Sequence, residues 1–450
     1  MKDNYILGIN FLHSDTSACI FKNGKLIAAA EEERFTRVKH TSAFPINSIY
    51  FCLEEAKIQI DQISKVTLNS NPFNALGRKV LFTLKNINRL KLGFNSLANV
   101  KKKININKYF SNLYPNKNKK LKFDYIDHHE AHIASSYYFS NFDESVNVSL
   151  DGFGDFVSCA WGSATKNKKK LIDKKIYFPH SLGIFYQALT QFLGFKNYGD
   201  EYKIMGLAPY GKPKYVEKLR DMILIKNKGN FELNLDYFKF HKKNFNYRWE
   251  NGKVEIEDLY TNKILDLLGP ARKKEDPLNE FHRDVAHSTQ KIYEEVFLNI
   301  INYLYEKYQN KNLCIAGGCG MNSVANGKIK NNTKFKNIYI QAAAGDAGGA
   351  IGAAFASYYQ NKKEKRKFQM RHAYWGTSFD EDKILKCIKE NEKNIKQQNC
   401  NYQKIFDDND LSKLVAKDIH DGKVVGWFQG KMEWGPRALG NRSILGDPRK

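Results

Sequence analysis

Short apolar segments separated by polar turns open the chain. Residues 5–10 (YILGIN) are typical of a strand, 11–15 (FLHSD) of a polar turn, and 16–30 of two more strands joined by the Asn-Gly turn of KNGK. The same order of strand, turn and strand returns at 146–163, where the glycine-rich segment DGFGD (151–155) is expected to form the turn. Two such hairpins indicate a duplicated architecture.

Farther along the chain the apolar spacing changes to that of helices. Residues 284–306 carry apolar side chains at the period of an amphipathic helix. The buried strand LCIA (313–316), the glycine loop GGCGMN (317–322) and another helix are expected to follow. Residues 338–359 then repeat strand, loop and a helix rich in Ala and Gly. The alternation of strands and helices predicts an α/β fold.

The length of the chain predicts more than one domain. Its 450 residues exceed the roughly 100–200 residues of an ordinary domain. The charged segment NKKEKRK (361–367) is typical of a linker, and VVGWF (424–428) predicts a strand beyond it. We therefore expect one domain over residues 1–360 and a second over 368–450. Residues 74–122 are rich in Lys and Asn and are expected to be helical and exposed.

The charge of the chain allows two interpretations. Lys and Arg number 72 against 48 Asp and Glu, which gives a formal net charge of +24. Such an excess favours nucleic acid, membrane surfaces or anionic small molecules as partners. The competing interpretation is a general bias toward Lys and Asn, seen in segments such as NKNKK. The distribution of the charge decides between the two.

Cysteines and apolar runs indicate the compartment. The seven cysteines are scattered, and none belongs to a CxxC pair, which argues against a disulfide framework or a zinc ribbon and for a reducing cytoplasm. The N-terminal segment has no long apolar stretch typical of a signal peptide. No run of about 18 apolar residues is present, so we expect no membrane span.

The segment DHHEAH (127–132) is the densest group of metal-ligand side chains. His128 and His132 stand at i and i+4, so on a helix both imidazoles share one face and can bind one ion. Asp127 or Glu130 then offers a carboxylate to orient them. Eleven histidines make a chance pair plausible, so the spacing alone is weak evidence. His129 points elsewhere in this arrangement and is expected to be structural.

A carboxylate elsewhere in the chain fits the same site. Asp346, in AAAGDAGGA, follows a predicted strand and precedes a helix of small residues, so it faces the carboxyl end of the sheet. A helix N-cap is the plain alternative and is compatible with this role. Two histidines and one carboxylate leave metal positions open for substrate, which suits Fe²⁺ or Zn²⁺.

Glycine loops and arginines offer anion sites. GGCGMN (317–322) lets backbone approach a nucleotide, although a tight turn explains it as well. DGFGD (151–155) offers backbone N–H groups to an anion but lacks the ending of a P-loop. The segment EEERFTRVKH (31–40) contains the basic residues Arg34, Arg37, Lys39 and His40. They favour either a clamp that binds phosphate or a solvated basic face. Arg437 and Arg442 can bind phosphate bidentately.

Taken together, these segments resemble a known family, the O-carbamoyltransferases of nodulation-factor and antibiotic biosynthesis. The resemblance covers essentially the whole chain. It rests on HSDTSACIF, AAAEEERFTRVKH, DHHEAH, SLDGFGD, SLGIFYQALTQFLGF, GDEYKIMGLAPYG, GGCGMN, GDAGGAIGAA and FQGKMEWGPRALGNRSILGDPR, in family order. Nine such matches are more specific than any one of them.

The resemblance implies a fold and a reaction. It implies a duplicated N-terminal domain similar to actin, Hsp70 and sugar kinases, followed by an α+β domain similar to YrdC. In the second domain carbamoyl phosphate and ATP, with Mg²⁺, give carbamoyl adenylate and pyrophosphate. The first domain then transfers the carbamoyl group to a hydroxyl of a sugar or secondary metabolite. An acceptor of this kind is expected, and nucleic acid is not.

The same resemblance assigns roles to residues. It implies that His128, His132 and Asp346 are iron ligands, so Fe²⁺ is expected and Zn²⁺ is the alternative. Contacts to the carbamoyl adenylate are implied for Lys39, Asp151, Ser181, Gly318 and Asn322. His13 is expected to act as general base or substrate contact, since a neutral imidazole is suitably basic near pH 7. Arg437 and Arg442 are expected to hold carbamoyl phosphate or ATP.

Two departures from the family pattern keep alternatives open. Lys431 stands where many members have Arg, which weakens a bidentate contact there. The pattern also continues beyond DPRK (447–450), so a truncated C-terminal domain is expected and adenylate formation would depend on the missing part. A tRNA-modifying protein of the same fold, or a nucleotide-binding module without activity, are the alternatives.

Overall fold

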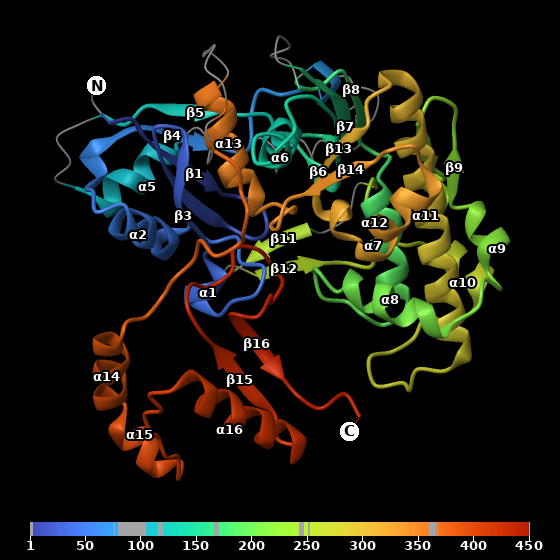
Figure 1. The fold of residues 1–450 in the computed structure, drawn as a ribbon. Coiled ribbons are helices and arrows are strands. Elements are labelled where there is room, and N and C mark those ends of the chain that lie inside the picture. Colours follow the sequence, from blue (N-terminus) through green and yellow to red (C-terminus); the bar gives the residue numbers. More distant parts are fainter. Residues whose placement is uncertain are drawn as a thin grey trace. The chain divides into compact units, whose positions relative to one another are not determined.

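The chain folds into two compact units, Met1–Met370 and Arg371–Lys450. The structure is a computed structural model that describes residues 3–75, 77–79, 105–115, 120–165, 171–242, 247–250, 253–359, 366 and 368–449. Two five-stranded sheets form the frame of the first unit (Figure 1). The predicted linker at 361–367 lies outside the described residues except for Arg366.

The two sheets of the first unit share one topology. Their strand orders are β3-β2-β1-β4-β5 and β8-β7-β6-β13-β14. In each sheet the first three strands of this order are antiparallel to their neighbours, and the last two run parallel to the third, which is β1 or β6. The duplication and the α/β class predicted from the sequence are confirmed, and this order is that of the actin, Hsp70 and sugar-kinase class. The strands are β1 Tyr5–Asn10, β2 Ser17–Lys22, β3 Lys25–Glu31, β4 Ile63–Leu68, β5 Phe123–Tyr125, β6 Ser145–Gly154, β7 Val157–Ala164, β8 Lys174–Tyr177, β13 Asn312–Ala316 and β14 Asn337–Ile340.

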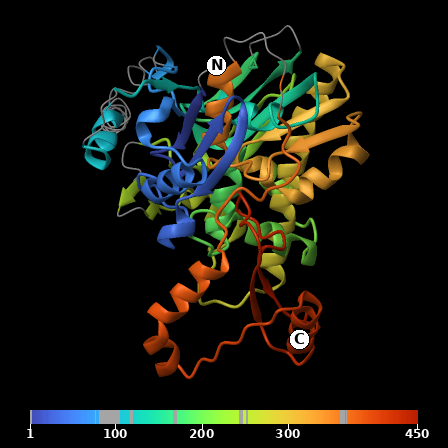
Figure 2. The ribbon, with the colours of Figure 1, turned by 60° about the vertical axis from the view of Figure 1, so that its left-hand side comes forward.

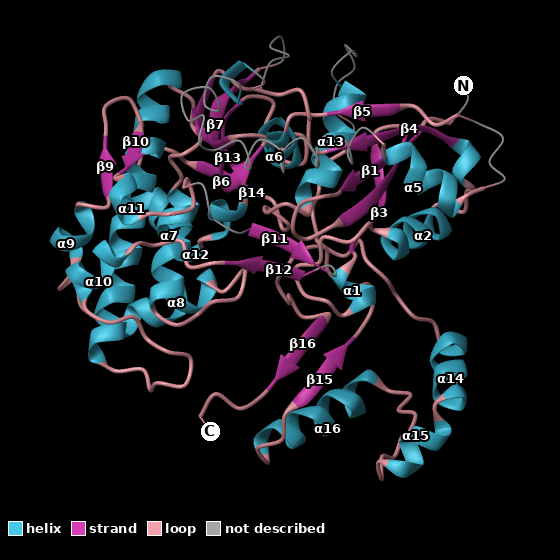
Figure 3. Cartoon of the chain, turned by 180° about the vertical axis from the view of Figure 1, so that it is seen from behind, coloured by secondary structure: helices cyan, strands magenta, loops and turns pink. Residues whose placement is uncertain are grey.

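Two helices pack against each other between the sheets (Figures 1 and 3). Helix α6, His128–Tyr137, contacts strands of the second sheet, and α13, Gly348–Tyr359, contacts strands of the first. Every residue of α13 is buried, as its small side chains require. A Cβ at Gly352 would lie 1.8 Å from the carbonyl oxygen of Ala131, so glycine permits the close approach.

Longer helices cover the outer faces of the sheets. They are α2 Ile46–Glu55 and α5 Ile106–Leu113 beside the first sheet, and α7 Leu182–Phe192, α11 Glu280–Tyr308 and α12 Ser323–Asn332 beside the second. The helix predicted at 284–306 is thereby confirmed as part of α11. Asn279 caps α11 by accepting from the His282 amide, and Gln309 ends it in a left-handed conformation with φ 51°.

Shorter elements connect these layers. The helices are α1 Glu33–Thr36, α8 Glu201–Leu207, α9 Val216–Arg220 and α10 Asn262–Leu268, and the 3₁₀ turns are η1 Ile60–Gln62, η3 Ala208–Tyr210, η4 Leu235–Tyr237 and η5 Gly318–Met321. Two hairpins pair β9 Ile223–Ile225 with β10 Phe231–Leu233, and β11 Tyr247–Glu250 with β12 Lys253–Ile256.

Two expectations from the sequence differ from the structure. The segment DGFGD is no turn over its whole length, because β6 continues through Gly154 and the turn falls at Asp155 and Phe156. Of the segment 74–122, residues 80–104 lie outside the described part. Where it is described, α5 buries Ile106 and Phe110, so full exposure was wrong there. These two side chains join the core of the first sheet because they lie one turn apart on one helix face.

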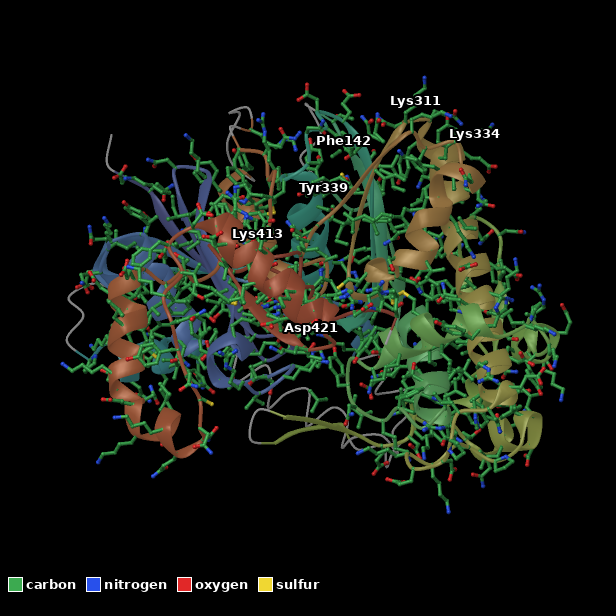
Figure 4. All side chains as sticks on the ribbon, turned by 60° about the horizontal axis from the view of Figure 1, so that its bottom comes forward. Phe142, Lys311, Lys334, Tyr339, Lys413 and Asp421 are labelled. Atoms are coloured by element: carbon green, nitrogen blue, oxygen red, sulfur yellow. The ribbon has the colours of Figure 1, made fainter. Side chains whose placement is uncertain are left out.

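Exposed lysines are spread over the second half of the first unit. Lys311 and Lys334 extend outward at one of its ends, and in that view nitrogen and oxygen ends of side chains are interspersed (Figure 4). Lys214 pairs with Glu280 at 2.7 Å and Lys328 with the buried Glu294 at 2.6 Å. Such interspersed pairs accord with the general Lys bias of the chain.

The second unit contains α14 Glu381–Glu390, α15 Glu392–Gln397, α16 Asp408–His420 and the antiparallel pair β15 Val425–Phe428 and β16 Arg442–Leu445 (Figure 2). The strand predicted at 424–428 is confirmed. Within the described part of the chain, no helix is both long and apolar enough to cross a membrane.

Candidate metal centre and the loops around it

Four side chains that are far apart in the sequence converge in the first unit. The Nε2 atoms of His128 and His132 lie 3.0 Å apart. An Asp151 carboxylate oxygen lies 3.1 Å from the His128 Nε2 and 3.5 Å from that of His132. One oxygen of Asp346 lies 3.5 Å from both nitrogens. We call these four residues the metal cluster, since their ligand atoms all lie within 4.8 Å of one another.

The fold explains why the cluster forms. Asp151 lies on β6, and Asp346 follows β14, so both stand near the carboxyl ends of parallel neighbours in the second sheet. This edge is where open α/β sheets bind ligands. Helix α6 brings the histidines to the same place, and Asp127 caps it by accepting from the Glu130 amide at 3.0 Å. The prediction that the two imidazoles lie on one face of a helix is confirmed.

The electrostatics of the cluster favour positive charge. Burial alone would lower the pKa of His132, but hydrogen bonds and charge from Asp151 and Asp346 raise it to about 9. Burial likewise would raise the pKa of Asp151, but its hydrogen bonds to the two histidines hold that pKa well below the usual range. The two carboxylates thus favour positive charge in this buried space, and a bound metal ion would have to displace the proton from the imidazole.

The residues present fit a transition-metal ion. Each carboxylate presents one oxygen to the cluster and has the other anchored: Asp151 accepts from the Gly318 amide at 3.0 Å and Asp346 from the Ser14 hydroxyl at 2.9 Å. Anchoring of this kind orients ligands in metal sites. Two imidazole nitrogens and two carboxylate oxygens suit Fe²⁺ or Zn²⁺. The resemblance implied Asp151 at the adenylate, whereas the structure adds its carboxylate to the metal cluster.

His129 lies outside the cluster. Its Nδ1 lies 2.9 Å from the Ser149 hydroxyl and its Nε2 lies 2.9 Å from the Val157 carbonyl oxygen. Burial, together with the neighbouring His128 and His132, lowers its pKa to about 3, so the ring is neutral. Because both ring nitrogens are used between β6 and β7, the predicted structural role of His129 is confirmed.

Gly154 makes room for His128. A Cβ at Gly154 would lie 1.9 Å from the His128 ring, whereas at Gly152 a Cβ would meet nothing within 4 Å. The glycines of DGFGD are therefore not equivalent. Gly154 is required by the close approach of an imidazole rather than by an anion.

The turn between β1 and β2 reaches the cluster from the first sheet. The His13 ring lies 4.8 Å from that of His128, centroid to centroid. The buried Ser14 hydroxyl contacts both Asp346 and, at 2.7 Å, the Tyr198 hydroxyl. The sequence predicted His13 here, and Ser14 was missed although it belongs to the same quoted segment.

Lys39 lies on a neighbouring loop. Its exposed ammonium group lies 5.4 Å from the centre of the Tyr202 ring. The adjacent His40 hydrogen-bonds through Nδ1 to Asp15 at 2.7 Å, which joins this loop to the β1–β2 turn. Burial would lower the pKa of His40, but the bond and charge of Asp15 raise it. The loop that contains Lys39 is thereby held next to the turn that contains His13.

Of the predicted adenylate contacts, Ser181 and Asn322 are helix caps. Ser181 accepts from the Ile184 amide and donates to the Gly152 carbonyl at 2.7 Å. Asn322 accepts from the Ala325 amide at 3.0 Å. The amides of Asn322 and Gln290 also exchange two hydrogen bonds, at 2.9 and 3.1 Å. Their roles toward a ligand stay predictions.

The sequence reasoning missed Gln290. It is one of several buried polar positions on α11, so the sequence pattern alone does not single it out. Tyr186 donates to its side-chain oxygen at 2.8 Å, and its nitrogen donates to Glu294 at 3.0 Å. These partners fix the orientation of the Gln290 amide and, through it, that of Asn322.

Arg437 and Arg442 lie in the second unit. Arg437 is exposed, and Arg442 begins β16 and donates to the Gly435 carbonyl at 3.4 Å. The buried Glu433 carboxylate accepts from the amides of Leu439 and Asn441, both at 2.8 Å, and thereby shapes the loop that carries Arg437. Their predicted contact with phosphate stays a prediction.

With this geometry in view, comparison with known families is decisive. A family model described as "Carbamoyltransferase N-terminus" matches residues 5–355, and one described as "Carbamoyltransferase C-terminus" matches residues 416–450. The chain belongs to the carbamoyltransferase family. The resemblance drawn from the sequence motifs is thereby confirmed, and with it the prediction of an enzyme of this family.

Relatives of the family match most of the chain. Protein sll1178 of Synechocystis is 38% identical over 99% of this chain and 71% of its own length. The nodulation protein NolNO of Sinorhizobium fredii is 31% identical over 98% of the chain and 59% of its own length. NolO of Bradyrhizobium diazoefficiens is 32% identical over 72% of the chain and 54% of its own length. The chain therefore spans only part of each of these relatives.

Solved structures give a more distant likeness. Component A of the (R)-2-hydroxyglutaryl-CoA dehydratase of Acidaminococcus fermentans matches 80% of this chain and 100% of its own, with 13% identity and a TM-score of 0.41. HypF of T. kodakarensis matches 79% of this chain and 47% of its own, with 12% identity and a TM-score of 0.37. The fold class rests on the strand order of the two sheets.

Proposed function

We propose that the protein acts as an ATP-dependent O-carbamoyltransferase. Carbamoyl phosphate and water give carbamate and phosphate, carbamate and ATP give carbamoyl adenylate and pyrophosphate, and the carbamoyl group is then transferred to a hydroxyl of a sugar or another small molecule, with release of AMP. The observation that carries this proposal is the family match over residues 5–355, which contains the whole metal cluster and the His13 loop beside it.

The first unit is proposed as the transferase. A bound Fe²⁺ or Zn²⁺ ion would be held by His128, His132, Asp151 and Asp346. When bound, it would supply a Lewis acid for an oxygen of the intermediate. His13 lies beside the cluster in the turn between β1 and β2, where its imidazole can accept the proton of the acceptor hydroxyl. Removal of that proton makes the oxygen nucleophilic toward the carbamoyl carbon.

Polar groups near the cluster are proposed to hold the adenylate. The η5 turn and Asn322 stand on the second-sheet side, and the fixed amide of Asn322 has one N–H left after its bond to Gln290. Ser181 holds the Gly152 carbonyl beside Asp151, so it shapes the same wall. Lys39 is proposed to contact phosphate, because its ammonium is exposed on the loop tied to Asp15.

The second domain is proposed to form the adenylate. We place the transferase in residues 1–360 and the start of a YrdC-like domain in 368–450. Arg437 and Arg442 are proposed to bind carbamoyl phosphate or ATP, since guanidinium groups match phosphate oxygens. The relatives are longer than this chain, so adenylate formation is proposed for the whole protein rather than for these residues alone.

The experiment that tests this proposal separates the two half-reactions. The purified chain is incubated with synthetic carbamoyl adenylate and a panel of sugars, and carbamoylated products are detected by mass spectrometry. In a second vessel it receives ATP, carbamoyl phosphate and Mg²⁺, and pyrophosphate is measured. Product in the first vessel that is lost in His13→Ala supports the transferase. Release of AMP without any carbamoylated acceptor, in wild type and variant alike, overturns it.

A further inference from the structure

One carboxylate next to the metal cluster has no place in the proposed chemistry. Asp155, the last residue of DGFGD, accepts three hydrogen bonds. Its Oδ1 accepts from the Ser70 hydroxyl at 2.6 Å, and its Oδ2 accepts from the amides of Asn71 at 2.8 Å and His128 at 3.1 Å. These donors come from two segments of the chain, the loop after β4 and the first turn of α6.

Asp155 and Phe156 form the two-residue turn between β6 and β7, since Gly154 pairs with Val157. Both adopt left-handed conformations, with φ 51° and 71°, as the central residues of tight hairpin turns do. The three hydrogen bonds to the Asp155 carboxylate therefore come in addition to an ordinary turn, and they are what needs an explanation.

We propose that Asp155 is a positioning residue that holds His128 in the metal cluster and couples the first sheet to it. The inference rests on the metal ion of the proposed function. It assigns to the second Asp of DGFGD a role in orienting a ligand, whereas Asp151 of the same segment is itself a candidate ligand.

The contact acts on the backbone of His128. His128 is the first residue of α6, so its N–H has no acceptor inside the helix. The Asp155 carboxylate supplies that acceptor at the positive end of the helix dipole. The His128 ring has little freedom to readjust, because a single added carbon at Gly154 would already collide with it. A shift of the first turn of α6 therefore moves Nε2 away from Asp151.

The contact also joins the two halves of the first unit. Asp155 lies between β6 and β7 of the second sheet, whereas Ser70 and Asn71 follow β4 of the first. A second tie runs from Ser14, after β1, to the candidate ligand Asp346. Through these two ties, the geometry of the cluster depends on how the first sheet is placed.

The test measures metal binding rather than turnover. The full chain is stripped of metal and titrated with Co²⁺, and the d–d absorption spectrum reports affinity and geometry. We expect Asp155→Ala to bind Co²⁺ about 10–100-fold more weakly, the range found when groups that orient ligands are removed. Asp155→Asn, which keeps one acceptor oxygen but turns an amide N–H toward a donor, is expected to fall between Asp155→Ala and wild type.

Asp284→Ala is the matched control. Asp284 is a buried carboxylate that accepts a backbone hydrogen bond from Lys212 at 2.7 Å, on a helix that contributes no residue to the cluster. The Asp284→Ala variant also loses a hydrogen bond between a buried carboxylate and a backbone amide. If a general loss of stability weakened Co²⁺ binding, both variants would therefore bind more weakly. We expect its Co²⁺ spectrum and affinity to equal those of wild type.

Hydrogen exchange provides a readout that needs no metal. In Asp155→Ala the peptide that contains the first turn of α6 is expected to exchange faster, while the same peptide in Asp284→Ala is unchanged. Equal Co²⁺ affinity and spectrum in Asp155→Ala and wild type overturn the positioning role alone. Absence of Co²⁺ binding by wild type, with His132→Ala indistinguishable from it, overturns the metal site itself, and the positioning role with it.

Discussion

The two hairpin turns that open the two sheets occupy equivalent places in the fold. The first joins β1 to β2 and contains His13 and Ser14, and the second joins β6 to β7 at Asp155. The strand before the turn also has an equivalent parallel neighbour in each sheet: β1 pairs with β4, and β6 pairs with β13. Duplication therefore points two equivalent turns toward the same region of the first unit.

The turns differ in what they deliver. The second strand and turn supply a candidate ligand, Asp151, room for His128 at Gly154, and the anchor Asp155. The first turn supplies no ligand, and its Ser14 orients Asp346. Both turns contain non-glycine residues with positive φ, at Leu12 and Asp15 in the first. One strand and its turn thus contribute a residue of the metal cluster directly, and the other turn contacts the cluster through Ser14.

The largest expected effect comes from removing a ligand. His132→Ala should lose bound metal and reduce carbamoyl transfer by more than about 100-fold, because a metal ion stabilises developing charge by several kcal/mol. Metal content by elemental analysis and transfer from synthetic carbamoyl adenylate provide the measurement. Circular dichroism should remain that of the wild type, and full activity in a metal-free variant would refute the assignment.

A test at the second turn uses its two glycines. Gly154→Ala places a carbon 1.9 Å from the His128 ring, so we expect a destabilisation of about 1–3 kcal/mol and weakened Co²⁺ binding. Gly152→Ala, with open space around its Cβ, is the matched control and should bind Co²⁺ like wild type. Denaturant unfolding and Co²⁺ titration measure the two effects. Equal Co²⁺ affinity in both variants would contradict the close fit at Gly154.

The first turn should show a smaller effect. Ser14→Ala removes one hydrogen bond from the Asp346 carboxylate, which is worth about 1.5–3 kcal/mol when an acceptor is charged and buried. We expect metal affinity to fall about 10-fold and the His13 function to persist. Co²⁺ titration of Ser14→Ala and of Ser70→Ala, which removes the Ser70–Asp155 hydrogen bond, shows which of the two contacts between the sheets matters more for metal affinity. A Ser14→Ala variant with undiminished affinity would mean that Asp346 needs no anchor.

The smallest effect is expected at Ser181. Loss of its hydroxyl in Ser181→Ala removes the cap of α7 and should lower the free energy of unfolding by about 1 kcal/mol. Metal affinity should not change, because the hydroxyl contacts the backbone carbonyls of Gly152, at 2.7 Å, and Asp151, at 3.3 Å, rather than the Asp151 carboxylate. A large rise in KM for carbamoyl adenylate beyond this stability change would show that Ser181 contacts the intermediate directly.

Local patterns predicted local structure well. Strands β1 and β13 and helix α11 follow from runs and periods of apolar residues, because burial of one face decides the conformation of such segments. The turn expected over DGFGD was wrong in extent, since glycines also occur in strands where another group comes close. The exposure expected around α5 failed because Ile106 and Phe110 find a core that their own segment does not reveal.

The sequence by itself determined the chemistry of the candidate site and its family, because His128 and His132 share one helix face and nine motifs follow in order. Only the tertiary structure decided that Asp151 joins them, since a carboxylate on β6 meets α6 through the packing of the second sheet. The same holds for Asp155 and Ser14. Their partners lie far away in the sequence, and no local pattern encodes a contact that two sheets make together.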